Sequence, residues 1–188
     1  IFNENGSFEF VVVDEAGNRT RALATVDYID KIKPQITFTS NEFDGKKHKF
    51  AEVIINAADI SGIKELKYAI ARIGQTPDDY KNCSNGESIL IEGLEDGTYT
   101  VFAIAVDNAG NSATSTSQNI YMDSTPPVAE ITYFPATRTA QNVIATIRFN
   151  EEAVVTNNNS SNEYSFTENG EFIFEFSDIA GNAGTKIA

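Results

Sequence analysis

A five-residue phrase, Asp-x-Ala-Gly-Asn, occurs three times in this chain of 188 residues. The copies are DEAGN at 14–18, DNAGN at 107–111 and DIAGN at 178–182. A second landmark follows at a fixed distance, because Pro34 lies 20 residues after Asp14 and Pro127 lies 20 residues after Asp107. Two landmarks that keep one spacing indicate a repeated module. A repeat in a chain of this length favours several small domains over one large domain.

The residues before each phrase alternate in the manner of a strand. In the first copy Phe8, Phe10 and Val12 fall on one side of an extended chain, with Glu9 on the other. The third copy repeats the pattern with three phenylalanines, Phe172, Phe174 and Phe176. Period-two alternation of aromatic and β-branched residues is typical of a half-buried strand, and the residues after each phrase are again rich in β-formers. Each copy therefore predicts an antiparallel hairpin with the phrase as its turn.

Two interpretations of the phrase compete. As a turn, its glycine adopts positive φ without steric cost, and the flanking Asp and Asn bond the turn amides. As a metal loop it is poorly equipped, because calcium takes ~6–8 oxygens and DNAGN offers one carboxylate. It also lacks the alternating acids and the closing Glu of an EF-hand. We therefore predict structural turns at three sets of residues: Asp14, Gly17 and Asn18; Asp107, Gly110 and Asn111; Asp178, Gly181 and Asn182.

Further short strands are expected between the hairpins. They are predicted at 35–40, 50–59, 61–72 and 87–94 in the middle copy, and at 128–135, 142–150, 153–157 and 163–168 in the third. The segment 61–72 also fits a helical period, and we predict a strand because Ser61-Gly62 resembles a tight turn. Six or seven short strands per repeat indicate an all-β fold of tandem sandwich modules with antiparallel sheets.

The repeats divide the chain into three parts. Residues 1–33 are predicted to be the C-terminal hairpin of a truncated module, 34–126 a complete module, and 127–188 a short module with a clipped last strand. The chain begins at Ile1 without Met, so we expect it to be a segment of a longer protein.

The strand and turn GTYTVFAIAVDNAGN at 97–111, the other DxAGN hairpins and the Asp-x-x-x-Pro linkers together resemble tandem bacterial immunoglobulin-like repeats. The resemblance covers nearly the whole chain. It implies an Ig-like β-sandwich, placement in a large surface or secreted protein, and modules joined like beads on a string. It transfers no catalytic residue. Within this family pattern Tyr99 is similar to the corner tyrosine of Ig-like sandwiches, although Gly6 and Gly170 stand at the aligned positions.

Composition excludes several classes of function. The net charge is −13 and the 14 Lys and Arg residues are scattered, which argues against nucleic acid as a partner. No apolar run approaches the ~20 residues that span a bilayer, so we predict no membrane insertion. The single cysteine, Cys83, allows no disulfide within the chain, and with a single histidine, His48, zinc of the Cys/His type is excluded. We predict no catalytic residue in this chain.

The longest irregular connection, 73–88, is a candidate binding loop, since long loops on rigid sandwiches often carry binding function. Its candidate ligand-binding residues are Asp78, Asp79 and Tyr80, with a glycan or a host protein as the partner. The alternative is a structural insertion in which Thr76 caps a short helix and Pro77 takes its first position.

The linkers hold a second candidate site. Asp30 and Asp123 occupy equivalent positions just before the linker prolines, where Asp27, Glu130 or a neighbouring loop could join them. Calcium bound there would stiffen the joint between two modules. In the alternative reading, which we prefer, each Asp caps a turn at a strand end. No cofactor is therefore predicted, and calcium remains the alternative.

These patterns predict a non-catalytic extracellular spacer or stalk, secreted or associated with the cell wall of a Gram-positive bacterium. Its partners are the neighbouring domains of the same chain. Two alternatives stay open: a module that binds a glycan or a host protein through 73–88, and an accessory region of a secreted hydrolase such as a peptidase or glycosidase.

Overall fold

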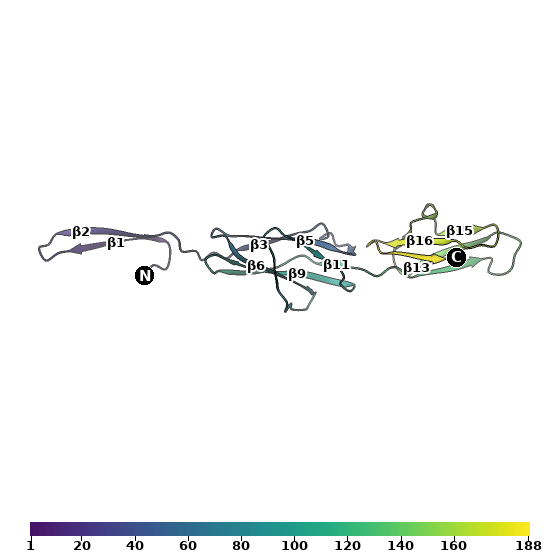
Figure 1. Ribbon diagram of the computed structural model, residues 1–188, viewed down its shortest axis with the longest axis horizontal. Coiled ribbons are helices and arrows are strands. Elements are labelled where there is room, and N and C mark those ends of the chain that lie inside the picture. The colour runs from purple at the N-terminus through teal and green to yellow at the C-terminus, as the bar shows by residue number, and fades with distance from the viewer.

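The computed structural model describes all residues 1–188, and its strands form three separate groups arranged end to end (Figure 1). An N-terminal two-stranded hairpin is followed by a middle sandwich and a C-terminal sandwich. All strand pairs are antiparallel except the short parallel pair of β4 (Lys47–His48) with β11 (Ile120–Met122). The fold is therefore all-β, as the alternation predicted.

The middle sandwich packs two sheets against each other. One sheet has the order β3 (Gln35–Thr39), β5 (Ala51–Ala58), β8 (Ser88–Ile91). The other has the order β4, β11, β9 (Gly97–Asp107), β6 (Ile63–Arg72), β7 (Lys81–Asn82), with β10 (Ser112–Thr116) also paired to β9. Alternate residues of β5 and β9 point inward, so that Val53, Ile55 and Val101 are fully buried. In β5 the residues between them, Glu52, Ile54 and Asn56, are exposed, which accounts for the period of two in that strand. In β9 most of the residues between them are half-buried.

The C-terminal sandwich repeats this plan with fewer strands. One sheet contains β12 (Ala129–Phe134), β13 (Val143–Phe149) and β15 (Glu163–Phe166). The other contains β14 (Ala153–Val155), β16 (Ile173–Asp178) and β17 (Ala183–Ile187), and a 3₁₀ turn, η1 (Asn158–Ser160), precedes β15. Its core consists of Ala129, Ala145, Ile147, Val155, Phe174 and Phe176.

Both sandwiches divide their strands in the same way. The first, second and fourth main strands form one sheet, and the third, fifth and sixth form the other, which is the division of an immunoglobulin-like sandwich. Tyr99 adds a further mark of this fold, because its hydroxyl donates to the carbonyl of Glu95, four residues upstream, at 2.9 Å. The Ig-like character expected from the DxAGN pattern is thus present in the strand order and in the corner tyrosine.

The N-terminal hairpin consists of β1 (Gly6–Val13) and β2 (Arg19–Val26), which pair only with each other. It corresponds to β16 and β17 of the C-terminal sandwich, without the strands that cover them. Its apolar side chains are accordingly exposed: Phe8 is 56% exposed and Phe10 51%.

The ambiguous segment 61–72 is a strand, β6, as predicted. The short helix predicted at Thr76 and Pro77 is wrong, since residues 75–80 have no regular structure. One helical turn gains few hydrogen bonds of its own. Here the chain gains more by extending to the sheet edge, where Lys81 and Asn82 pair with β6. The residue limits assigned to the three modules stay predictions, although the segments 27–34 and 123–128 contain no strand.

Candidate functional site at the module joints

All three DxAGN phrases form the same hairpin turn. In the middle copy the amide of Asp107 donates to the carbonyl of Asn111 at 3.0 Å, and Gly110 has a φ of +94°. The two carboxylate oxygens of Asp107 accept from the amide and the side chain of Asn111, each at 2.8 Å. The other two copies repeat these contacts, with φ of +86° at Gly17 and +88° at Gly181. The three-residue loop closes with a left-handed glycine, a conformation that favours glycine.

The asparagine of the turn also holds the preceding linker. Asn111 Nδ2 donates to the carbonyl of Asp30 at 3.3 Å, and Asn182 Nδ2 donates to the carbonyl of Asp123 at 2.9 Å. One side chain therefore bonds both the turn aspartate and the linker backbone. The phrase is thus a turn and also an anchor between consecutive modules.

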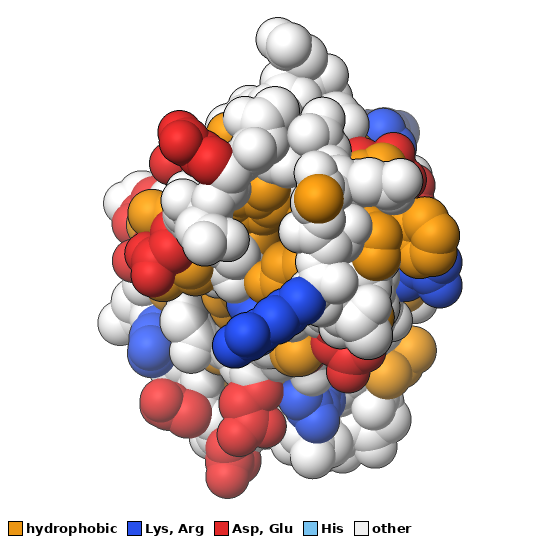
Figure 2. All heavy atoms as spheres, turned by 90° about the vertical axis from the view of Figure 1, so that its right-hand side faces the viewer, with side chains coloured by type: hydrophobic (Ala, Val, Ile, Leu, Met, Phe, Trp, Pro, Cys, Tyr) orange, Lys and Arg blue, Asp and Glu red, His pale blue; other side chains and the backbone are white.

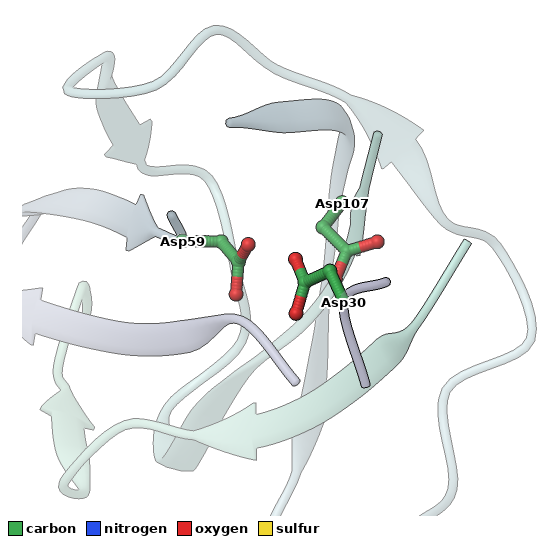
Figure 3. A group of neighbouring side chains, drawn as sticks. All are labelled: Asp30, Asp59 and Asp107. Atoms are coloured by element: carbon green, nitrogen blue, oxygen red, sulfur yellow. The ribbon is translucent and has the colours of Figure 1, made fainter. Parts of the chain in front are cut away.

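We call the first such place joint 1, where the carboxylates of Asp30, Asp59 and Asp107 meet (Figure 3). Asp30 comes from the linker, Asp59 from the connection between β5 and β6, and Asp107 from the end of β9. One oxygen from each residue lies within 4.8 Å of the other two. Figure 3 shows the carboxylate groups pointing toward one another. Asp107 is fully buried, and the other two are half-buried.

The hydrogen bonds at joint 1 leave one acceptor without a donor. Asp30 Oδ1 accepts from the amide of Ile32 at 2.9 Å, as in a turn cap, but Asp30 Oδ2 is buried with no hydrogen-bond partner. Asp59 Oδ1 accepts from the amide and hydroxyl of Ser61. No Lys, Arg or His nitrogen lies within 4.0 Å of the three carboxylates. Joint 1 is a cluster of acids with no positive partner.

Joint 2, at the second linker, is built from the equivalent elements. Its carboxylates belong to Asp123, Glu151 and Asp178, again with one oxygen of each within 4.8 Å of the others. Asp123 is 3% exposed and Asp178 6%. Here a positive group is present, because Lys47 Nζ lies 2.8 Å from Asp123 and 3.7 Å from Glu151. Lys47 belongs to the middle sandwich and Glu151 to the next, so this ion pair crosses the joint.

A second unsatisfied oxygen lies at joint 2. Asn182 is 1% exposed, and its Oδ1 has no hydrogen-bond partner, while its Nδ2 bonds Asp178 and Asp123. The two buried side-chain atoms without partners in the whole chain, Asp30 Oδ2 and Asn182 Oδ1, are thus divided between the two joints. Unsatisfied buried polar atoms are uncommon in folded proteins, and each calls for an explanation.

The local fields shift the pKa values of several of these groups. Burial acts to raise the pKa of Asp107, but the hydrogen bonds from Asn111 and the turn amides outweigh it and hold the pKa below its ordinary value. The hydrogen bond to Asp123 raises the pKa of Lys47. The hydroxyl of Thr125 and the amide of Ser124 lower the pKa of Asp96, where the middle sandwich meets the second linker. Asp107, Lys47 and Asp96 are therefore all held in their charged forms.

The structure only partly matches the expected surroundings of the linker aspartates. Neither Asp27 nor Glu130 joins the clusters, which take Asp59 and Glu151 instead. Asp27 and Glu130 are both exposed, and Glu130 lies within β12. The connections before β6 and β14 supply the acids because they lie beside the hairpin turn at the same end of each sandwich. Sequence offered one signal, an acid after the second strand of each module.

The candidate binding loop 73–88 lies on the side of the middle sandwich. Asp78 and Asp79 line an open groove of about 330 Å³. Residues of β6 and β8, among them Ile70 and Leu90, also line it. Tyr80 is half-buried and does not line this groove. The structure therefore brings together two of the three predicted ligand-binding residues.

Other candidates for chemistry are placed in structural roles. Burial raises the pKa of the Cys83 thiol, with the nearby carboxylate of Glu87 adding to it, so that the less reactive protonated form is favoured. His48, in the short strand β4, places its Nε2 2.8 Å from Oδ1 of Asp44. Viewed along the axis from the C-terminal sandwich, Lys and Arg side chains are dispersed among acidic and uncharged ones (Figure 2). The structure contains no helix with the length and apolarity needed to cross a membrane.

The class of fold is therefore a tandem array of immunoglobulin-like sandwich modules. No family model matches the chain, and no curated protein matches it. Among solved structures, it is similar to fibronectin(III)-like modules of CbhA from Clostridium thermocellum, at 12% identity and a TM-score of 0.40, over 80% of this chain and 91% of that one. It is also similar to a tetra-tandem repeat in the extending region of a large adhesion protein, at 18% identity and a TM-score of 0.39. That match covers 98% of this chain and 56% of the other.

Proposed function

We propose that this chain is a non-catalytic spacer, a run of Ig-like modules that holds other parts of a longer protein at a set distance. The observation that carries the proposal is that each linker is bonded to the modules on both of its sides. A flexible tether would lack these bonds, whereas a stalk depends on them to fix the direction of each module relative to the last.

The second linker is the more firmly held. Its Ser124 bonds Asp96 of the middle sandwich through the amide at 2.7 Å and the hydroxyl at 3.1 Å. One residue earlier in the chain, the carbonyl of Asp123 accepts from Asn182 of the C-terminal sandwich. The first linker is held in a similar way. Asn5 of the N-terminal hairpin bonds the backbone of Ile29, and Asn111 of the middle sandwich bonds the carbonyl of Asp30. Bonds on both sides of a short linker restrict its bending.

The test measures how far the chain holds its two ends apart. Residues 1–188 are placed between a surface anchor and a fluorescent reporter, and the height of the reporter is measured by fluorescence interference. A spacer gives a greater and narrower height than a Gly/Ser linker of equal length. Deleting 34–126 shortens it, and an unrelated Ig-like module in that place restores it. A height equal to that of the Gly/Ser linker would refute the spacer function.

We also propose an extracellular location in a bacterium of the Gram-positive type, with neighbouring domains of the same chain as partners. The acidic net charge of −13 and the lack of any disulfide are compatible with this placement. Service as an accessory region beside a secreted peptidase or glycosidase is a variant of the same function, since the modules would then position a catalytic domain.

A second candidate function is recognition of a glycan or a host protein by the loop 73–88. The groove beside Asp78 and Asp79 favours it, because carboxylates next to an apolar floor suit the hydroxyl groups and ring faces of a sugar. The variant Asp78→Ala/Asp79→Ala separates the two functions. Loss of capture on a glycan array at unchanged melting temperature supports binding, whereas no capture by the unmodified chain refutes it.

A further inference from the structure

We propose that joint 1 binds one divalent cation of the calcium type through Asp30, Asp59 and Asp107, and that the ammonium group of Lys47 takes the place of this cation at joint 2. The inference does not depend on the spacer function, since the ion would bind whatever the modules are used for. It concerns a site that the turn interpretation of the linker aspartates left aside.

Charge is the first argument. Three carboxylates at joint 1 have oxygens within 4.8 Å of one another, and Asp107 among them is fully buried. Like charges at this distance repel, and the repulsion is stronger where the surroundings exclude water. Asp107 accepts hydrogen bonds from the amide and the side chain of Asn111, each at 2.8 Å, and these favour a carboxylate. No basic side chain lies within 4.0 Å to neutralise the three carboxylates. The cluster therefore favours the binding of a cation.

The unpartnered oxygen is the second and independent argument. Asp30 already satisfies its turn through Oδ1, which accepts from Ile32. Its Oδ2 is buried and without a donor. Figure 3 shows the Asp30 carboxylate directed toward the other two acids. If Asp30 served only as a cap, burying its second oxygen would cost free energy, and no hydrogen bond would offset this cost. A bound cation would satisfy this oxygen directly.

Joint 2 shows what a cluster of this design requires. The same elements bring together Asp123, Glu151 and Asp178, and there Lys47 places its nitrogen 2.8 Å and 3.7 Å from two of the carboxylates. One positive charge thus accompanies the acids at joint 2. At joint 1 Lys31, the residue after Asp30, bonds the carbonyl of Asn3, and neither Lys31 nor Lys33 forms an ion pair with the cluster. The comparison indicates that joint 1 takes its positive charge from solution.

The donor set selects the kind of ion. All donors at joint 1 are oxygens, which suits calcium and magnesium and does not suit zinc or copper sites built from Cys and His. Oxygens on opposite sides of a calcium ion are ~4.6–5.2 Å apart, given Ca–O distances of ~2.3–2.6 Å. Magnesium would bring them to ~4.2 Å or less and demands a regular octahedron. Carboxylates from three separate segments suit the more tolerant calcium ion.

The consequence is mechanical. One ligand comes from the linker and two from the middle sandwich, so the ion would join the linker to the module that follows it. Lys47 does the same at joint 2 by bridging the linker and Glu151 of the next sandwich. The two joints would then be fastened by different means, one dependent on the ion and one permanent.

Isothermal titration with calcium chloride tests the assignment on the full chain 1–188, in buffer of matched ionic strength. We expect one calcium ion per chain, with a Kd of roughly 10⁻⁴ to 10⁻³ M, as in extracellular calcium modules. Asp59→Asn and Asp30→Asn should each weaken binding at least tenfold. Asp27→Asn removes one exposed charge from the same linker, outside the cluster, and serves as the matched control. No calcium-specific heat with the unmodified chain, or equal binding by Asp59→Asn, would overturn the proposal.

Thermal unfolding gives a second readout that a turn cap would not move. In EDTA, Asp59→Asn should melt at a higher temperature than the unmodified chain, because it relieves the repulsion. In calcium at about thirty times the Kd the order should reverse, since the unmodified chain gains a roughly thirtyfold larger folding constant and melts several degrees higher. Asn keeps the Oδ1 acceptor for Ser61, so a cap role predicts the same order in both buffers, which would refute the site.

Replacing Lys47 examines the other half of the proposal. Lys47→Gln removes the positive group from joint 2 and leaves its three acids in place. We expect this variant to bind two calcium ions where the unmodified chain binds one, with Glu151→Gln in the same background returning the number to one. An unchanged number in Lys47→Gln would overturn the assignment of Lys47 as the substitute cation.

Discussion

The first and third hairpins of this chain have similar sequences and opposite surroundings. NENGSFEFVVVDEAGN at 3–18 aligns without a gap with TENGEFIFEFSDIAGN at 167–182, and both segments form a hairpin with the same Asp and Asn contacts. Yet Phe10 is 51% exposed, whereas its counterpart Phe174 is fully buried. The hairpin is therefore encoded locally, and the core is supplied by the other strands of the sandwich.

The largest difference between the two hairpins should appear at these phenylalanines. Phe174→Ala empties a fully buried site between the two sheets and should cost about 3–5 kcal/mol of the unfolding free energy of the C-terminal sandwich. Phe10→Ala should change the unfolding free energy by less than about 0.5 kcal/mol, the range of exposed sites. Denaturation in urea measures both. A cost at Phe10 equal to that at Phe174 would mean that the N-terminal hairpin is covered in solution.

A smaller difference is expected one strand further on. Gly184 lies opposite Phe176, and a Cβ added to it would come within 2.5 Å of the ring, whereas the first hairpin has Thr20 opposite Val12. Gly184→Thr should therefore overpack the C-terminal sandwich and cost about 1–3 kcal/mol. The reverse change, Thr20→Gly, should have little effect on the melting of either sandwich. Thermal unfolding of the two variants compares them, and a neutral Gly184→Thr would contradict the packing of Phe176.

The third comparison concerns the asparagine of the turn. Asn182 is buried and bonds both Asp178 and the linker carbonyl of Asp123, whereas Asn18 bonds only its own turn. Asn182→Ala should cost about 1–3 kcal/mol because it leaves buried acceptors unsatisfied. It should also loosen joint 2, so that bent conformations reduce the radius of gyration measured by small-angle X-ray scattering of the full chain. Asn18→Ala is the control. Equal scattering of the two variants would show that the asparagine anchors only its turn.

The sequence predicted the strands well and the joints poorly, for physical reasons that differ. The alternation of Phe172, Phe174 and Phe176, and the glycine of each turn, are local signals, and the fold follows from them. The choice of strand for 61–72 was correct because an all-β surrounding outweighs a helical period. The short helix at Thr76 failed because a sheet edge competed for the same backbone.

The clusters at the joints are not local features. Asp30 and Asp107 are 77 residues apart in the sequence and meet only because the linker enters beside the hairpin turn. Sequence could identify Asp30 and Asp123 as equivalent, because a repeat places them at the same offset from proline. It could not select Asp59 over Asp27, since that choice depends on which loops share one end of a sandwich. Two roles for one phrase, turn and anchor, also become visible only in three dimensions.

The smallest expected difference is in acid sensitivity, and it compares the buried Asp107 with the exposed Asp14. The pKa of each lies below its ordinary value of 3.8 in the folded chain, through hydrogen bonds from Asn111 and Asn18 respectively. A lowered pKa contributes stability that is present above the unfolded value and lost as the pH falls through the folded one. The middle sandwich should therefore lose stability below about pH 4.

Melting temperature against pH in EDTA, followed for the unmodified chain and for Asp107→Asn and Asp14→Asn, resolves this contribution. Asp107→Asn should flatten the decline of the middle sandwich between about pH 5 and pH 3, because Asn111 then has no carboxylate to stabilise. Asp14→Asn should leave both sandwich transitions unchanged at every pH, since its turn is part of no core. If Asp107→Asn kept the full decline, the acid sensitivity would belong to other carboxylates, and the turn aspartate would act through its geometry alone.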